Sequence, residues 1–60
     1  MTKEMIHNEL MERVETFNRV SEDYTKFKNK FGVESEVFEE SLRELGEMIQ
    51  HLGALEEIYD

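Results

Sequence analysis

Apolar residues recur every three or four positions along most of the chain, which is the spacing of one face of an α-helix. In the first half the successive steps are 4, 4, 3, 3, 4, 3 and 4, and the positions are Ile6, Leu10, Val14, Phe17, Val20, Tyr24, Phe27 and Phe31. In the second half the steps are 4, 3, 4, 3, 3 and 4, and the positions are Phe38, Leu42, Leu45, Ile49, Leu52, Leu55 and Tyr59. Neither series alternates as a β-strand does, so the pattern predicts an all-α fold with two helices.

The break between the two series predicts a turn. Gly32 suits the left-handed position that ends a helix, and Ser35 suits the N-cap that begins the next one. We therefore expect a single domain over residues 1–60, with a helix at about 3–31, a turn at 32–35 and a helix at about 36–59. Because the turn is short, the helices must form an antiparallel hairpin, in which the numbers of facing residues sum to roughly 67.

The apolar stripe is wider than one partner helix can cover. On a helical wheel, Val37, Met48 and Leu55 widen one edge of the second stripe, and the apolar arc then spans roughly 160°. A chain of 60 residues without cysteine has no disulfide to stabilise a small core, which favours self-association. We expect two hairpins to pack as a dimeric four-helix bundle. Its core would contain Leu10, Phe17, Tyr24, Phe27, Phe38, Leu42, Leu45, Ile49 and Leu52.

Two charged residues interrupt the apolar stripes. Arg13 lies within the first stripe and Glu56 within the second. With the expected register, Arg13 faces residue 54 and lies within reach of Glu56. We therefore predict an ion pair between Arg13 and Glu56 in or at the edge of the core, where a buried polar pair can fix register or oligomer geometry.

The negative charge is concentrated in the second half of the chain. The formal net charge is -8, and residues 32–60 carry the whole surplus, because acidic and basic residues balance in residues 1–31. Such a charge disfavours direct binding to nucleic acid or to a membrane surface, which requires basic residues. An acidic face opposite the second apolar stripe suits a basic protein partner and consists of Glu40, Glu44, Glu47 and His51.

Other features argue against a secreted, membrane-spanning or cofactor-dependent protein. The segment 1–7 lacks the apolar core of a signal peptide, and no run approaches the ~20 apolar residues of a membrane span. Without cysteine, and with His7 and His51 far apart, no zinc-binding or nucleophile set can be assembled. We expect a cytoplasmic protein without a cofactor.

A short motif resembles that of a nucleotide-hydrolysing family. Glu44-Leu45-Gly46-Glu47, followed by Glu57-Ile58-Tyr59-Asp60, resembles the ExxE and ExxD metal-binding pattern of the MazG-like nucleotide pyrophosphohydrolases. The resemblance implies a helical oligomer that hydrolyses nucleoside triphosphates with magnesium. In this chain no loop places the two halves of the motif on separate helices.

The turn region resembles a second family, the small helical-hairpin phosphatases that act on aspartyl-phosphate response regulators in spore-forming bacteria. Lys30-Phe31-Gly32-Val33 and the later Glu44-Leu45 are spaced as in that family. The resemblance implies a hairpin fold and phosphatase activity. The family's signature Ser and Asp are here Leu42 and Gly46, so the polar groups that the activity would require are replaced.

These observations favour a small acidic, non-enzymatic regulatory or assembly protein that acts through protein–protein interaction. A specific form of this hypothesis is an inhibitor that presents a DNA-like row of carboxylates to a nucleic-acid-binding protein. The alternative is an enzyme fragment of one of the two families, a helical-hairpin phosphatase or a metal-dependent nucleotide pyrophosphohydrolase.

Overall fold

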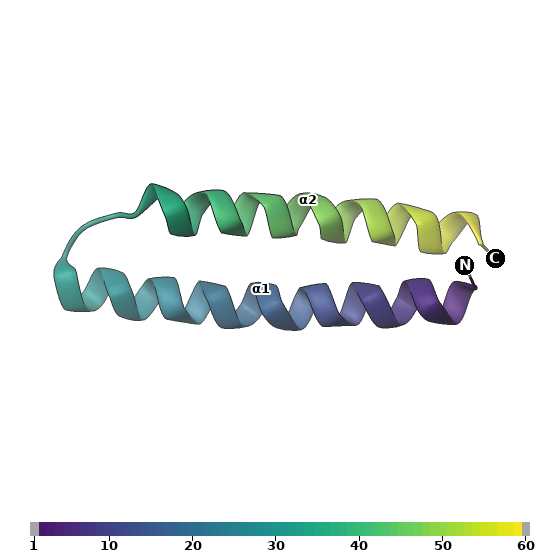
Figure 1. The fold of residues 1–60 in the computed structure, drawn as a ribbon, viewed down its shortest axis with the longest axis horizontal. Coiled ribbons are helices and arrows are strands. Elements are labelled where there is room, and N and C mark those ends of the chain that lie inside the picture. Colours follow the sequence, from purple (N-terminus) through teal and green to yellow (C-terminus); the bar gives the residue numbers. More distant parts are fainter. Residues whose placement is uncertain (1, 60) are drawn as a thin grey trace.

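The computed structural model describes residues 2–59 as two long helices joined by a short linker. Helix α1 covers Lys3–Phe31 and helix α2 covers Glu36–Ile58. The helices run antiparallel and side by side, with both termini at the same end of a rod that measures 45 × 15 × 13 Å (Figure 1). The predicted all-α helical hairpin is confirmed. Within the described residues, neither helix contains an apolar stretch long enough to cross a bilayer.

Local hydrogen bonds explain where the helices begin and end. The side-chain oxygen of Thr2 accepts a hydrogen bond from the backbone N–H of Met5 at 3.2 Å, and that of Ser35 accepts one from Phe38 at 3.4 Å. Both are N-caps, which supply partners for the first N–H groups of a helix. Gly32 ends α1 with φ of 67°, a left-handed backbone that suits glycine, and its N–H donates to a carbonyl of the preceding turn at 2.8 Å.

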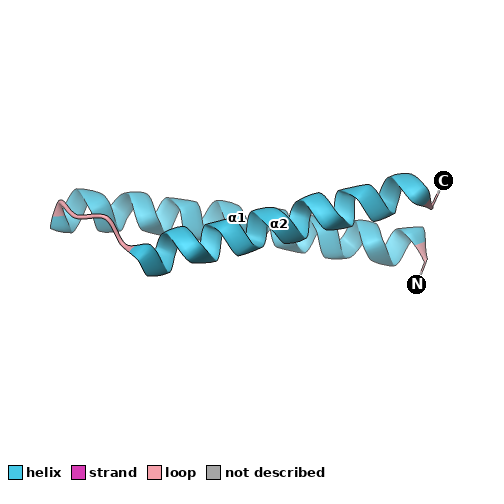
Figure 2. Cartoon of the chain, turned by 90° about the horizontal axis from the view of Figure 1, so that it is seen from above, coloured by secondary structure: helices cyan, strands magenta, loops and turns pink. Residues whose placement is uncertain are grey.

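The helices are offset by about one turn from the expected register. Tyr24 stacks on Phe38 and hydrogen bonds to Glu39, and His7 pairs with Glu56, so the numbers of facing residues sum to 62 or 63. An offset of about four residues corresponds to about 6 Å along the helix axis. Helix α1 therefore extends past the beginning of α2, and the linker runs back alongside it (Figures 1 and 2).

The hairpin alone buries few side chains. Within residues 2–59, only Ile6 and Tyr24 are buried. The other eight predicted core residues are half-buried: Leu10, Phe17, Phe27, Phe38, Leu42, Leu45, Ile49 and Leu52. The large apolar side chains that are exposed are Met5, Met11, Phe31, Val33, Val37, Met48, Ile58 and Tyr59. The predicted core stripe is therefore only partly covered in the single hairpin, and the dimer stays a prediction.

Candidate interaction surface

A hydrogen-bonded tyrosine fixes the linker to α1. The Tyr24 hydroxyl donates to Oε2 of Glu39 at 2.7 Å and accepts a hydrogen bond from the backbone N–H of Ser35 at 3.1 Å. Ser35 is also the N-cap of α2. One buried side chain of α1 thus positions both the end of the linker and the first turns of α2.

The surroundings of Tyr24 favour its neutral form. Burial raises the pKa of its hydroxyl, and the hydrogen bond to Glu39 and the negative charges of Glu39 and Glu34 raise it further; the hydrogen bond from Ser35 acts in the opposite direction. The hydroxyl therefore keeps its proton, and with it the donor that Glu39 requires.

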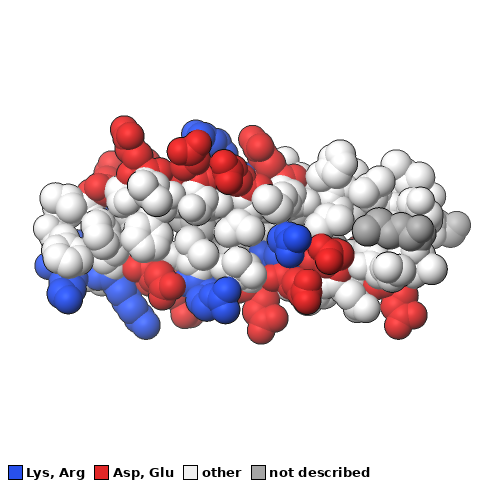
Figure 3. All heavy atoms as spheres, in the orientation of Figure 1, with Lys and Arg blue, Asp and Glu red and all other residues white. Residues whose placement is uncertain are grey.

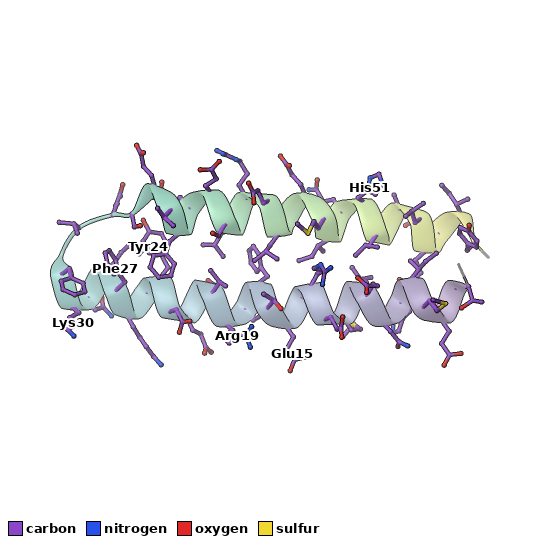
Figure 4. All side chains as sticks on the ribbon, viewed as in Figure 1. Glu15, Arg19, Tyr24, Phe27, Lys30 and His51 are labelled. Carbon is purple, nitrogen blue, oxygen red and sulfur yellow. The ribbon has the colours of Figure 1, made fainter. Side chains whose placement is uncertain are left out.

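Aromatic rings surround this hydrogen-bonded group. The rings of Tyr24 and Phe38 stack with 5.1 Å between centroids and 5° between planes, and Phe27 lies 5.4 Å from Phe38. The labelled side chains of Tyr24 and Phe27 lie near the linker, on the side of α1 that faces α2 (Figure 4). Lys28 lies 4.4 Å above the ring of Tyr24, a cation–π contact. Three of the nine predicted core residues thus meet in one cluster.

The predicted ion pair between Arg13 and Glu56 is wrong. Arg13 instead pairs with Glu9, four residues earlier on the same helix, at 3.2 Å. Glu56 pairs with His7 of α1, with 2.8 Å between Oε1 of Glu56 and Nδ1 of His7. The cause is the offset between the helices, which places Arg13 opposite residue 50 instead of 54. The His7–Glu56 pair joins the two helices near their terminal ends.

The residues of the predicted acidic face are accessible to solvent. Glu40, Glu44, Glu47 and His51 are all exposed, and Figure 4 shows His51 on the side of α2 away from α1. Figure 3 shows acidic residues gathered over α2 along the upper edge of the molecule. Arg43 lies 3.8 Å from Glu40 and partly neutralises that end of the row.

The acidic face adjoins a surface groove that sequence analysis did not predict. The groove has a volume of about 510 Å³. Its lining combines carboxylates, one guanidinium and apolar side chains: Glu9, Arg13, Glu44, Glu47, Met48, His51 and Leu52. Figure 3 shows a band of uncharged side chains between the two helices, with charged residues on both sides. An apolar strip with a charged rim is the anatomy of a protein–protein contact.

The described side chains of the groove are not placed as a metal-binding set. Within residues 2–59, no group of three or more His, Asp or Glu side chains is placed to hold a metal ion. In the motif that resembles the pyrophosphohydrolases, Asp60 lies outside the described residues, and Glu44 and Glu57 lie on the same helix. Where the hairpin phosphatases carry a Ser, this chain has the half-buried Leu42.

Sequence analysis missed the interhelical hydrogen bonds because each depends on the register. Tyr24 lies in the apolar series, so its ring was expected in the core, but its hydroxyl partners, Ser35 and Glu39, follow only from the offset. The hydroxyl of a buried tyrosine usually has a hydrogen-bond partner. This rule could have predicted that the Tyr24 hydroxyl is hydrogen bonded, but not to which residues.

Comparisons of the chain with protein-family models, with curated proteins and with solved structures gave no match.

Proposed function

We propose that this chain is a small acidic, non-enzymatic regulatory or assembly protein that forms a homodimeric four-helix bundle and binds another protein through its acidic face. The accessible surface area of the hairpin is the observation on which the dimer depends. The hairpin exposes 4797 Å² at a mass of 7.2 kDa. A folded monomer of that mass typically exposes about 4,100 Å².

The same relation between mass and accessible surface area supports a second copy of this chain as the molecule that covers the apolar strip between the helices. Two separate hairpins expose about 9,600 Å², twice the area of one. A compact protein of twice the mass exposes about 6,800 Å². The difference, about 2,800 Å², falls within the range of obligate homodimer interfaces, about 2,000–5,000 Å². Covering the half-buried stripe and exposed side chains such as Met48 would account for this area.

Sedimentation of the purified chain tests the dimer. We expect a species of about 14 kDa, twice the chain mass, at micromolar concentration. Met48→Lys places a charge at the edge of the groove and should shift the equilibrium toward the monomer. Ala54→Lys, which makes the same change in charge at an exposed position of α2, is the matched control and should stay dimeric. A folded monomer at high concentration would contradict the proposal.

The acidic face supports a basic protein surface as the partner. Its carboxylates are exposed and lie on the helix that carries most of the surplus charge. An inhibitor that imitates the phosphate row of DNA would use such a face against a nucleic-acid-binding protein, and such binding weakens steeply with salt.

A matched pair of variants tests this contact in an extract of the native host. Glu40→Gln with Glu47→Gln removes two charges from the acidic face, whereas Glu4→Gln with Glu22→Gln removes two exposed charges from α1. Only the first variant should fail to retain proteins that elute from the wild-type chain at moderate salt. Equal loss in both variants would contradict a role for the face, and phosphatase or pyrophosphatase turnover would contradict a non-enzymatic function.

A further inference from the structure

One side of the hairpin, here the open face, carries apolar side chains that α1 and α2 leave partly or largely uncovered. On α2 it consists of Val37, Met48 and Leu55, which return to the same side of the helix at spacings of eleven and seven. Val37 is 76% and Met48 44% exposed. On α1, Val20 and Phe27 follow Arg13 at steps of seven, and Arg13 lines the same groove as Met48. The open face therefore includes both helices.

The two helices differ in charge. Residues 3–31 hold six acidic and six basic side chains, so α1 is neutral overall. Helix α2 holds Arg43 as its one basic residue against seven acidic residues: Glu36, Glu39, Glu40, Glu44, Glu47, Glu56 and Glu57. Packing one α2 against another would bring two strongly acidic helices together. Packing α2 against a neighbouring α1 would not.

Charged residues at the outer edges of the open face repeat with the heptad spacing that flanks a helix–helix contact. On α1 they are Glu12, Arg19 and Lys26, and on α2 Glu44 and His51 stand seven residues apart in the same way. Glu44 and His51 line the groove, and Figure 4 shows Arg19 along the lower side of α1. The numbers of Arg19 and Glu44, and those of Glu12 and His51, sum to 63, the register that the hairpin itself adopts.

The sum of 63, shared by these pairs and by the facing residues of the hairpin, favours one orientation for a second copy. A two-fold axis parallel to the helices keeps every residue at its own height along the rod and places each α1 against the α2 of the other copy. Residues at equal height then face each other across the contact, as Arg19 and Glu44 would. A two-fold axis perpendicular to the helices would place α2 against α2 and reverse the heights.

We propose that a second copy docks on the open face in the same direction, with both linkers at one end, so that Arg19 meets the partner subunit's Glu44 and Glu12 meets the partner subunit's His51. This inference rests on the proposed dimer and adds the face, the direction and the paired residues. It assigns Glu44 and His51 to the edge of the dimer contact and leaves Glu40 and Glu47 of the acidic face for the protein partner. All neighbouring helices in such a bundle run antiparallel, as in up-down-up-down four-helix bundles.

Distance measurement between spin labels tests the direction. The chain has no cysteine, so Glu34→Cys labels only the linker and Asn18→Cys only the middle of α1. With both linkers at one end, the labels at position 34 should lie far closer than the 45 Å length of the rod, because neighbouring helices are about 10 Å apart. The label at position 18 should give a short distance in either direction and confirms the dimer.

The outcomes separate the two proposals. A short distance at position 18 with a distance near the rod length at position 34 would leave the dimer standing and overturn the shared direction. No measurable interaction at either position would overturn the dimer, and this inference with it. Short distances at both positions support the inference.

Charge exchange tests the paired residues. At low salt, Arg19→Glu and Glu44→Arg should each weaken dimerisation about fivefold or more, since two symmetric pairs are lost and like charges meet. The double variant should recover most of the wild-type dissociation constant. Arg43→Glu, an equal change in charge at an exposed position, controls for the general effect of added negative charge. A double variant that dimerises no better than either single variant would contradict the pairing.

Discussion

The two ends of the hairpin are held together in different ways. At the closed end, next to the linker, the rings of Tyr24, Phe27 and Phe38 pack against one another, and the Tyr24 hydroxyl is bonded to both the linker and α2. At the terminal end, where α1 begins and α2 ends, the buried side chain is Ile6, and the interhelical pair of His7 and Glu56 is accessible to solvent.

This difference has consequences for stability and assembly. Aromatic packing with satisfied hydrogen bonds makes the closed end the part of the hairpin that can hold the register by itself. Within residues 2–59 the contacts between aromatic rings all lie at the closed end, and we expect the half without them to open first. The groove between Arg13 and Met48 lies in this half, so a second copy would contribute most where the single hairpin is weakest.

The largest effect is expected from removing a ring at the closed end. Phe38→Ala should lower the free energy of unfolding by about 3 kcal/mol, because it deletes the ring stacked on Tyr24. Chemical denaturation at one fixed protein concentration measures the loss. Phe31→Ala makes the same chemical change at a side chain that is 58% exposed and should cost less than half as much. Equal losses would contradict the special role of the closed end.

A smaller, more local effect is expected at the terminal end. Ile6→Ala should lower the free energy of unfolding by about 2 kcal/mol and speed amide hydrogen exchange chiefly in the first turns of α1. Met11→Ala, at an exposed side chain nearby, is the control and should leave exchange nearly unchanged. If Ile6→Ala sped exchange equally around Tyr24, the two ends would be one cooperative unit.

Replacing either of two glycines by alanine should change the free energy of unfolding by about 1 kcal/mol, in opposite directions. Gly53→Ala should raise the free energy of unfolding by about 1 kcal/mol, because the position is helical and a Cβ there meets open space. Gly32→Ala should lower it by about 1 kcal/mol, because φ of 67° is unfavourable for alanine. Thermal unfolding of both variants measures the contrast. Destabilisation by Gly53→Ala would mean that another chain approaches closely at that position.

Raising the pH should destabilise the closed end, where Tyr24 lies. The pKa of Tyr24 is raised in the folded state, so its contribution to stability is complete below the ordinary tyrosine pKa and is lost as pH rises through the folded value. Thermal unfolding between pH 8 and about 11.5 should show a steeper loss for the wild-type chain than for Tyr24→Phe, which keeps the ring. Parallel curves would show that the hydroxyl does not support the closed end.

The smallest effect is expected from the interhelical pair at the terminal end. Glu56→Gln should cost about 0.5 kcal/mol at low salt, because the His7 side chain is 53% exposed and such pairs are screened by solvent. Glu57→Gln changes the charge equally without breaking this pair and serves as the control. A loss for Glu56→Gln that persists in high salt would indicate packing instead of charge.

Sequence analysis predicted the helices and the turn because each depends on local rules. The spacing of apolar residues, the glycine at position 32 and the serine at position 35 act within a few residues of themselves. The register could not be predicted in this way, since it depends on how Tyr24 reaches the linker across the hairpin. Assuming that both helices end level at the turn produced the wrong partner for Arg13. The acidic face required no register, and its residues are exposed as expected.

The last turn of α1 extends beyond α2. The length of the loop and the alignment of the helices are therefore independent of each other in this hairpin. The alignment is set by a side chain seven residues before the end of α1 and not by the number of residues that connect the helices. Extra residues after Gly32 would lengthen a solvent-exposed loop at little entropic cost, about 0.6 kcal/mol for each doubling in length. Evolution or engineering could therefore vary the tip of this hairpin, or graft a binding segment into it, while the helices keep their places.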